Sequence, residues 1–170
     1  YAVVELSSFQ LHTMTLSPDI AVVTNISPNH LNYHKGMEEY IAAKENIFTH
    51  MRPGGRLVLN AENDYTRDMA NRAAEGTNLL FFGKDGDICE RDGYITSGGK
   101  RILRCSDILL PGHHNIENYM AAVGALRGIA DADAVHTVAV TFTGVEHRCE
   151  LVGERNGIKY YNSSIDSSPT

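Results

Sequence analysis

Short apolar runs alternate along the chain with segments of helical periodicity. Residues 20–23, 56–60 and 79–82 are mainly aliphatic or aromatic and lack polar alternation, which is typical of strands buried on both faces of a parallel sheet. Residues 1–4 have the same character and predict a further strand that ends at Glu5. A helix is predicted over residues 64–75. This order of strands and helices indicates an α/β domain with a mostly parallel sheet flanked by helices.

The segment from 37 to 48 has the clearest helical period. One face of the predicted helix contains Met37, Tyr40, Ile41, Lys44, Ile47 and Phe48. Lys44 therefore points inward among apolar neighbours. Its carbon stem could lie along the edge of the core with the ammonium in water, or its amine could be held dry near a charged ligand, where it loses its proton easily.

Two further residues combine reactive chemistry with a position at a strand end. In open α/β sheets, ligands bind beyond the carboxyl ends of the strands. His30 lies in the loop after strand 20–23, and Glu5 follows the predicted strand 1–4. A loop histidine is more often a surface residue than a ligand, and Glu5 could cap a helix, form an ion pair or bind a metal. The residues alone leave these roles open.

Glycines punctuate residues 84–105, which predicts a small antiparallel meander after the parallel strands. Within it, Gly98-Gly99-Lys100-Arg101 has some likeness to the end of a phosphate-binding P-loop. Tyr94 stands at the first glycine position of that motif and Arg101 at its final hydroxyl position. We therefore interpret Gly98-Gly99 as a hairpin turn, and the chain contains no P-loop.

A helix is predicted over residues 116–129, with Asn115 as its N-cap. Asn115 and Asn118 are three residues apart, so both amides can lie on one side of the helix start. An amide offers a donor and an acceptor together, which the edge of adenine requires. A short linker and helix are predicted over residues 130–140.

The end of the chain predicts a β-hairpin. Its strands are residues 150–155 and 158–162, joined across Asn156-Gly157. Arg148 precedes the hairpin and stands between Glu146 and Glu150, with which it could form a local ion pair.

Composition narrows the class of protein. The 170 residues are 42% hydrophobic and 21% charged, as in ordinary globular domains. A net charge of −6 gives no general affinity for nucleic acid or for an anionic membrane. There is no apolar run of transmembrane length and no signal peptide, and the 3 cysteines form no CxxC pair. We expect a cytoplasmic protein that is monomeric.

The run TNISPNHLNYHKGMEEYIAAK, residues 24–44, resembles the Mur ligases, which use ATP to add amino acids to the peptidoglycan precursor. In that family the histidine matching His30 helps to hold magnesium. The lysine matching Lys44 is carbamylated, and its new carboxylate also reaches the metal. The run E-x-S-S-F-Q-L, which starts at Glu5, is typical of the D-glutamate-adding members, whose matching glutamate is a magnesium ligand. The resemblance thus implies Mg²⁺ at Glu5, His30 and carbamylated Lys44.

Later motifs carry the same resemblance. G-x-H-N-x-x-N implies that Asn115 and Asn118 face the adenine of ATP, and F-x-G-x-x-H-R-x-E implies that Arg148 reaches the nucleotide phosphates. The resemblance also implies substrate contacts for Ser7 and Ser167. The final residues depart from the family pattern: Ser163 replaces an aspartate that handles nucleotide, and Asp166 occupies an alanine position.

The resemblance implies a piece of a longer protein with two parts. Residues 1–144 would be the central ATPase domain without its P-loop part, and residues 145–170 would begin the C-terminal, amino-acid-binding domain. The parent would phosphorylate the carboxylate of UDP-N-acetylmuramoyl-L-alanine with ATP, and the amine of D-glutamate would attack the acyl phosphate. We expect the isolated piece to be inactive.

Three alternatives remain open at this point. The first is another Mur ligase, or a ligase similar to folylpolyglutamate synthase, that adds a different amino acid. The second is a metallohydrolase using Glu5, His30 and His34, which would need a third close protein ligand and no ATP. The third is a degenerate nucleotide-binding domain, for which Ser163 is the main support.

Overall fold

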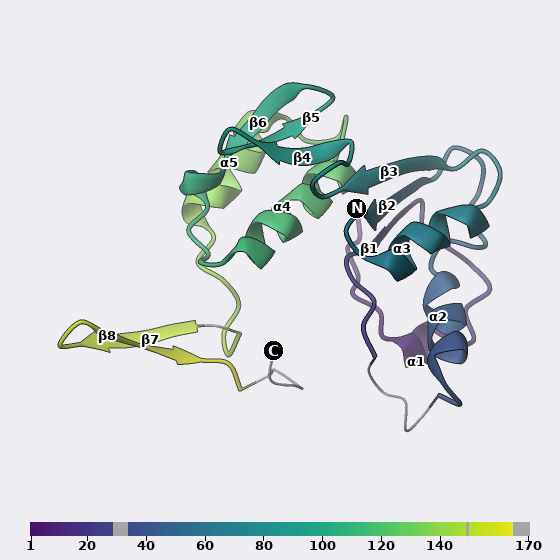
Figure 1. Cartoon of the computed structure of the whole chain (residues 1–170), viewed down its shortest axis with the longest axis horizontal. Helices are drawn as coiled ribbons and strands as arrows, with labels where there is room; N and C mark the ends of the chain where they lie inside the picture. The colour runs from purple at the N-terminus through teal and green to yellow at the C-terminus, as the bar shows by residue number, and fades with distance from the viewer. Residues whose placement is uncertain (29–33, 149, 165–170) are drawn as a thin grey trace.

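A six-stranded sheet forms the framework of the computed structural model, which describes residues 1–28, 34–148 and 150–164 (Figure 1). The strands lie side by side in chain order as β1 (Ile20–Val23), β2 (Arg56–Asn60), β3 (Asn78–Phe82), β4 (Ile88–Arg91), β5 (Tyr94–Ser97) and β6 (Lys100–Arg104). β1, β2 and β3 are parallel, whereas β4, β5 and β6 form an antiparallel meander. One parallel pairing, Phe82 with Ile88, joins the meander to β3. The predicted α/β class with a mostly parallel sheet and a small meander is confirmed.

Helices cover the sheet. They are α1 (Ser8–Leu11), α2 (Met37–Glu45), α3 (Asp64–Met69), α4 (His113–Ala125) and α5 (Ala132–Thr141), with the 3₁₀ turns η1 (Ala70–Arg72) and η2 (Cys105–Asp107). α4 packs on β1 to β5, α5 packs on β6, and α1 packs on α2. In the described part of the chain, no helix combines the length and hydropathy that a membrane span needs.

Strand β2, the middle one of the three parallel strands β1 to β3, has a hydrophobic core on each face. Leu57 and Leu59 belong to a cluster that also contains Phe48 and Met69, from the α2 and α3 side. Val58, between them in sequence, belongs to a second cluster with Met120 of α4. All three strand residues are fully buried. A parallel strand covered on both faces needs apolar residues at successive positions, which explains the absence of polar alternation.

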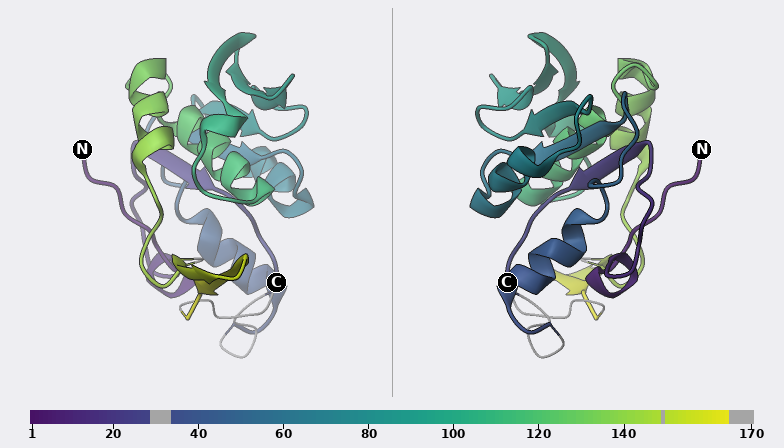
Figure 2. Two further views of the ribbon diagram at one scale, coloured as in Figure 1. Left: turned by 90° about the vertical axis from the view of Figure 1, so that its left-hand side faces the viewer. Right: turned by 90° about the vertical axis from the view of Figure 1, so that its right-hand side faces the viewer.

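The strand predicted over residues 1–4 is wrong. This segment is extended but forms no strand, and Tyr1 and Val3 are fully exposed. Figure 2 shows this end of the chain projecting from the rest of the molecule. A strand requires ladder hydrogen bonds with a neighbour, and none of the described strands pairs with these residues. An apolar run alone therefore did not determine the element.

Two predicted helices have different ends in the structure. The helix predicted over 64–75 stops at Met69 and tightens into η1, after which Ala73 is extended. The helix predicted over 116–129 begins at His113 and ends at Ala125, so Asn115 is not its N-cap. Gly112 occupies the cap with φ +97°, and a Cβ there would lie 2.6 Å from the His114 ring. This backbone turn, not a capping side chain, sets the start of α4.

Both predicted hairpin turns are confirmed. Gly98 and Gly99 have φ of +56° and +77°, as a tight turn between β5 and β6 requires, and no helix follows them. Asn156 and Gly157, with φ of +54° and +77°, join β7 (Glu150–Arg155) to β8 (Ile158–Asn162) in the same way. The β7–β8 hairpin extends away from the six-stranded sheet (Figure 1).

Candidate active site

Lys44 lies on the inward face of α2, as the sequence predicts. Its side chain is half-buried, and Nζ is 5.9 Å from the centroid of the Tyr40 ring, which is itself buried. Burial lowers the pKa of Lys44, and the negative charge of Glu5 partly opposes this effect. The structure thus brings Lys44 and Glu5, 39 positions apart in sequence, within electrostatic reach of each other.

The segment that carries Glu5 is oriented by the start of α1. Ser7 is the N-cap of this helix: its Oγ accepts a hydrogen bond from the Gln10 backbone N–H at 3.3 Å. The Ser7 N–H in turn donates to Gln10 Oε1 at 2.8 Å, which completes a capping box. Glu5 is exposed two residues earlier. Ser7 therefore has a structural role here, and its contact with substrate stays a prediction.

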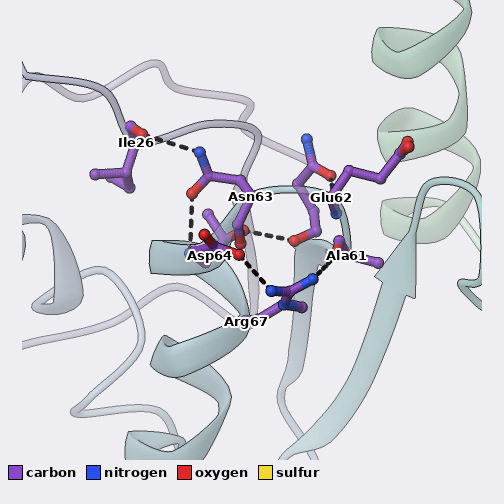
Figure 3. Close-up of polar contacts among 8 residues, drawn as sticks. Ile26, Ala61, Glu62, Asn63, Asp64 and Arg67 are labelled. Atoms are coloured by element: carbon purple, nitrogen blue, oxygen red, sulfur yellow. Dashed lines mark hydrogen bonds and ion pairs between the residues drawn. The ribbon is translucent and has the colours of Figure 1, made fainter.

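The loop that follows β1 is fixed to the loop that follows β2. Asn63 Nδ2 donates to Asn25 Oδ1 at 2.6 Å. It also donates to the Ile26 carbonyl at 2.9 Å (Figure 3). The Asn63 Oδ1 accepts from the Thr66 N–H at 3.1 Å and so caps α3. The Asn63 side-chain amide thus connects the loops after β1 and β2 to the start of α3. The sequence analysis missed Asn63, although an Asn before an acidic helix start is a recognisable cap signal.

The loop held by Asn63 leads to His30, which lies outside the described residues, as does Ser167. Their roles therefore stay predictions. His34, the other histidine of this segment, is buried, and its Nε2 is 3.0 Å from Ser8 Oγ. Among the residues described, a ring nitrogen of His34 groups with His12 and Glu39 rather than with Glu5.

Glu45 is a second residue that the sequence analysis missed. It follows Lys44 on α2, is buried, and forms an ion pair with Arg72 of η1 at 2.6 Å. Arg72 also pairs with Asp68 at 2.8 Å. These two ion pairs join α2 to the end of α3 through η1.

The two asparagines at the start of α4 lie together, as the sequence predicts. Asn118 Nδ2 is 3.4 Å from Asn115 Oδ1, and the Asn115 amide donates to the Pro111 carbonyl at 2.8 Å. A hollow of about 280 Å³ beside this helix end is lined by Glu62, Lys84, Glu90, Asp92, His113 and Met120. These residues include three carboxylates and one lysine, and the carboxylates can accept hydrogen bonds from hydroxyl and amino groups.

Arg148 is exposed in the segment before β7. Within the described part of the chain its guanidinium forms no ion pair with Glu146 or Glu150. Glu150 instead accepts a hydrogen bond from the His147 N–H at 2.9 Å. The local ion pair considered from the sequence is thus not formed here, and the contact of Arg148 with phosphate stays a prediction.

Comparison with known sequences shows which protein family the chain resembles. The Mur ligase middle domain matches residues 1–126. The chain is 51% identical to the UDP-N-acetylmuramoylalanine--D-glutamate ligase of Acetivibrio thermocellus and 48% identical to the enzyme of the same name from Clostridium kluyveri, each over 99% of this chain. It spans 37% of the length of each of these relatives.

Solved structures agree. MurF from Acinetobacter baumannii has a TM-score of 0.71 at 20% identity. The match covers 86% of this chain and 34% of the MurF chain. MurC from Thermotoga maritima has a TM-score of 0.64 at 23% identity. The match covers 88% of this chain and 34% of the MurC chain. Identities this low demonstrate the shared fold alone. Together with the sequence matches, they lead to one conclusion: the chain belongs to the Mur ligase family.

Proposed function

We propose that the chain is part of an ATP-dependent ligase that joins D-glutamate to UDP-N-acetylmuramoyl-L-alanine in the cytoplasm. The observation that carries this proposal is the 51% identity, over 99% of the chain, to a relative named for this reaction. The chain spans 37% of that relative, so we expect the activity in a longer protein. In that protein, residues 1–144 would belong to the central ATPase domain, and residues 145–170 would begin the amino-acid-binding domain.

The lowered pKa of Lys44 supports carbamylation of its amine. The reaction joins the neutral amine to CO₂, forms an N–C bond and releases a proton, so a lowered pKa favours it at a given pH. Burial lowers the pKa of Lys44. The product is a carboxylate in place of a half-buried cation, close to Glu5.

The resulting donor set suits Mg²⁺, which prefers oxygen ligands. Glu5 and carbamylated Lys44 would hold the ion together with His30. Bound Mg²⁺ would neutralise charge on the reacting phosphates.

The other residues would position ATP and the sugar-nucleotide substrate. Asn115 and Asn118 would present their paired amides to adenine, with the ribose towards the hollow beside α4, and Arg148 would contact the phosphates. Ser7 and Ser167 would contact the sugar-nucleotide substrate. The substrate carboxylate would attack the γ-phosphorus and release ADP, and the D-glutamate amine would then displace phosphate from the acyl phosphate, which forms the amide.

Phosphate release by the longer protein tests the reaction. With UDP-N-acetylmuramoyl-L-alanine, ATP and Mg²⁺, we expect release on addition of D-glutamate and not of other amino acids. Lys44→Gln should abolish release, while Lys100→Gln, an exposed lysine on β6, should not. Release with a different amino acid would overturn the substrate assignment. Full activity of Lys44→Gln would overturn the role of Lys44, and no release with any amino acid would favour the degenerate-domain alternative.

Carbamylation can be tested on this chain directly. In ¹³C-labelled bicarbonate, we expect a carbamate NMR signal that is lost in Lys44→Arg and kept in Lys100→Arg. Because the pKa of Lys44 is lowered, its amine is neutral at lower pH than that of an exposed lysine, so its carbamate should form at lower pH. A signal that survives in Lys44→Arg would contradict the assignment.

A further inference from the structure

We propose that His12, His34 and Glu39 form a binding site for a divalent transition-metal ion such as Zn²⁺, separate from the Glu5–Lys44 pair. Each residue offers one ligand atom, and these atoms all lie within 4.8 Å of one another. His12 follows the last residue of α1, His34 precedes α2, and Glu39 lies in the first turn of α2. α1 and α2 pack against each other (Figure 1).

The donor set suits zinc and not magnesium. Zn²⁺ binds imidazole nitrogens and carboxylate oxygens, and two histidines with one glutamate leave a fourth position for water. Mg²⁺ prefers an octahedron of oxygens, which this cluster does not provide. The proposed site therefore selects a different ion from the one proposed at Glu5 and Lys44, and it does not rest on the ligase proposal.

The distances need only a small adjustment. With bonds of about 2.0–2.1 Å, ligand atoms of a tetrahedral zinc site lie about 3.3 Å apart. Ligand atoms within 4.8 Å of one another would thus move together by about 1.5 Å at most. His12 is exposed at the end of a short helix, so its side chain can change rotamer without disturbing the core.

The two other ligands are held in place by their neighbours. The His34 ring is fixed by Ser8 Oγ at 3.0 Å and by the Tyr40 ring, whose centroid is 5.4 Å away. Outer contacts of this kind orient histidine ligands in metal sites. Glu39 Oε2 accepts a hydrogen bond from the Lys35 N–H at 2.5 Å. A carboxylate has a second oxygen, which stays available to a cation.

Glu39 supplies a carboxylate oxygen to the cluster, and His12 and His34 each supply an imidazole nitrogen. The Lys35 side chain is exposed, which lets its ammonium turn into solvent when an ion binds. A bound ion would connect α1, residues 34–36 and α2.

Cobalt titration of the chain tests the proposal, since four-coordinate Co²⁺ absorbs visible light and substitutes for Zn²⁺. We expect one Co²⁺ per chain, displaced by Zn²⁺ and not by excess Mg²⁺. His12→Ala and Glu39→Gln should each weaken binding about tenfold or more, which corresponds to about 1.4 kcal/mol. His50→Ala, an exposed histidine after α2, is the matched control and should bind as the unmodified chain does.

Circular dichroism of the apo variants would show that they are folded, which we expect because His12 is exposed and Glu39 is only half-buried. Absence of a four-coordinate Co²⁺ spectrum in the unmodified chain would overturn the proposal. So would unchanged affinity in both His12→Ala and Glu39→Gln. Loss of Co²⁺ binding in Glu5→Gln, with retention in His12→Ala, would place the ion at the Glu5–Lys44 pair and would also overturn it.

Discussion

The six-stranded sheet and the β7–β8 hairpin contain similar residues but are stabilised differently. Leu57 and Leu59 of β2 are fully buried between helices, whereas Leu151 and Ile158 of the hairpin are 52% and 59% exposed. β2 is held by packing on both of its faces. The hairpin is held by its ladder and by the Asn156-Gly157 turn.

This difference also separates the parts of the candidate site. Lys44 is oriented by the packed region, because α2 lies on a buried cluster and is joined to η1 by the Glu45–Arg72 pair. Arg148 is oriented only by an exposed segment beside the hairpin. We therefore expect substitutions in the first region to change global stability, and substitutions in the second to change local order only.

The largest expected effect is that of Leu59→Ala. Leu59 is fully buried on the face of β2 that packs against α2 and α3, so truncation leaves a cavity. We expect a loss of about 2–5 kcal/mol in the free energy of unfolding, measured by urea denaturation. Leu151→Ala in the hairpin is the matched control and should change it by about 0.5 kcal/mol or less. Equal losses in the two variants would contradict the separation of the regions.

A smaller loss is expected for Arg72→Ala. It removes the partner of Glu45, whose side chain is only 10% exposed, and leaves that carboxylate without compensation. We expect a cost of about 1–3 kcal/mol in the free energy of unfolding. Arg52→Ala, which breaks a pair with Asp19 between side chains 82% and 81% exposed, should cost about 0–1 kcal/mol. If Arg52→Ala lowered the free energy of unfolding as much as Arg72→Ala does, burial of Glu45 would not explain the loss in Arg72→Ala.

Sequence patterns predicted the elements whose signals are local. The bounds of β2 follow from one apolar run, and those of β7 and β8 follow from the turn between them. The inward position of Lys44 follows from helical period. Residues 1–4 were misjudged because a strand also needs a neighbour, and no local pattern shows whether one is present.

The missed parts of the site depend on contacts between distant segments. Asn63 binds the loop at Asn25, 38 positions away, and Arg72 binds Glu45, 27 positions away. Neither pair leaves a periodic pattern in the sequence, because both are produced by the packing of helices on the sheet. The same holds for the closeness of Glu5 and Lys44, which the family resemblance implied and periodicity did not.

The smallest global effect is expected for Gly157→Ala. Gly157 has φ +77°, which a residue with a Cβ adopts at a cost of about 1–2 kcal/mol. In the sheet a cost of this size would lower the stability of the whole chain. In the hairpin we expect faster amide hydrogen exchange in β7 and β8, with the urea midpoint of the whole chain unchanged.

Gly153→Ala is the control that separates the cost of a positive φ from the effect of replacing any hairpin glycine by alanine. Gly153 also lies in the hairpin, its φ is not positive, and no atom lies within 4 Å of an added Cβ, so hydrogen exchange in this variant should be the same as in the unmodified chain. If Gly157→Ala instead lowered the urea midpoint while Gly153→Ala did not, the turn would be coupled to the sheet. Arg148, which precedes β7, would then belong to the same cooperative unit as Lys44 and would be positioned by the packed region after all.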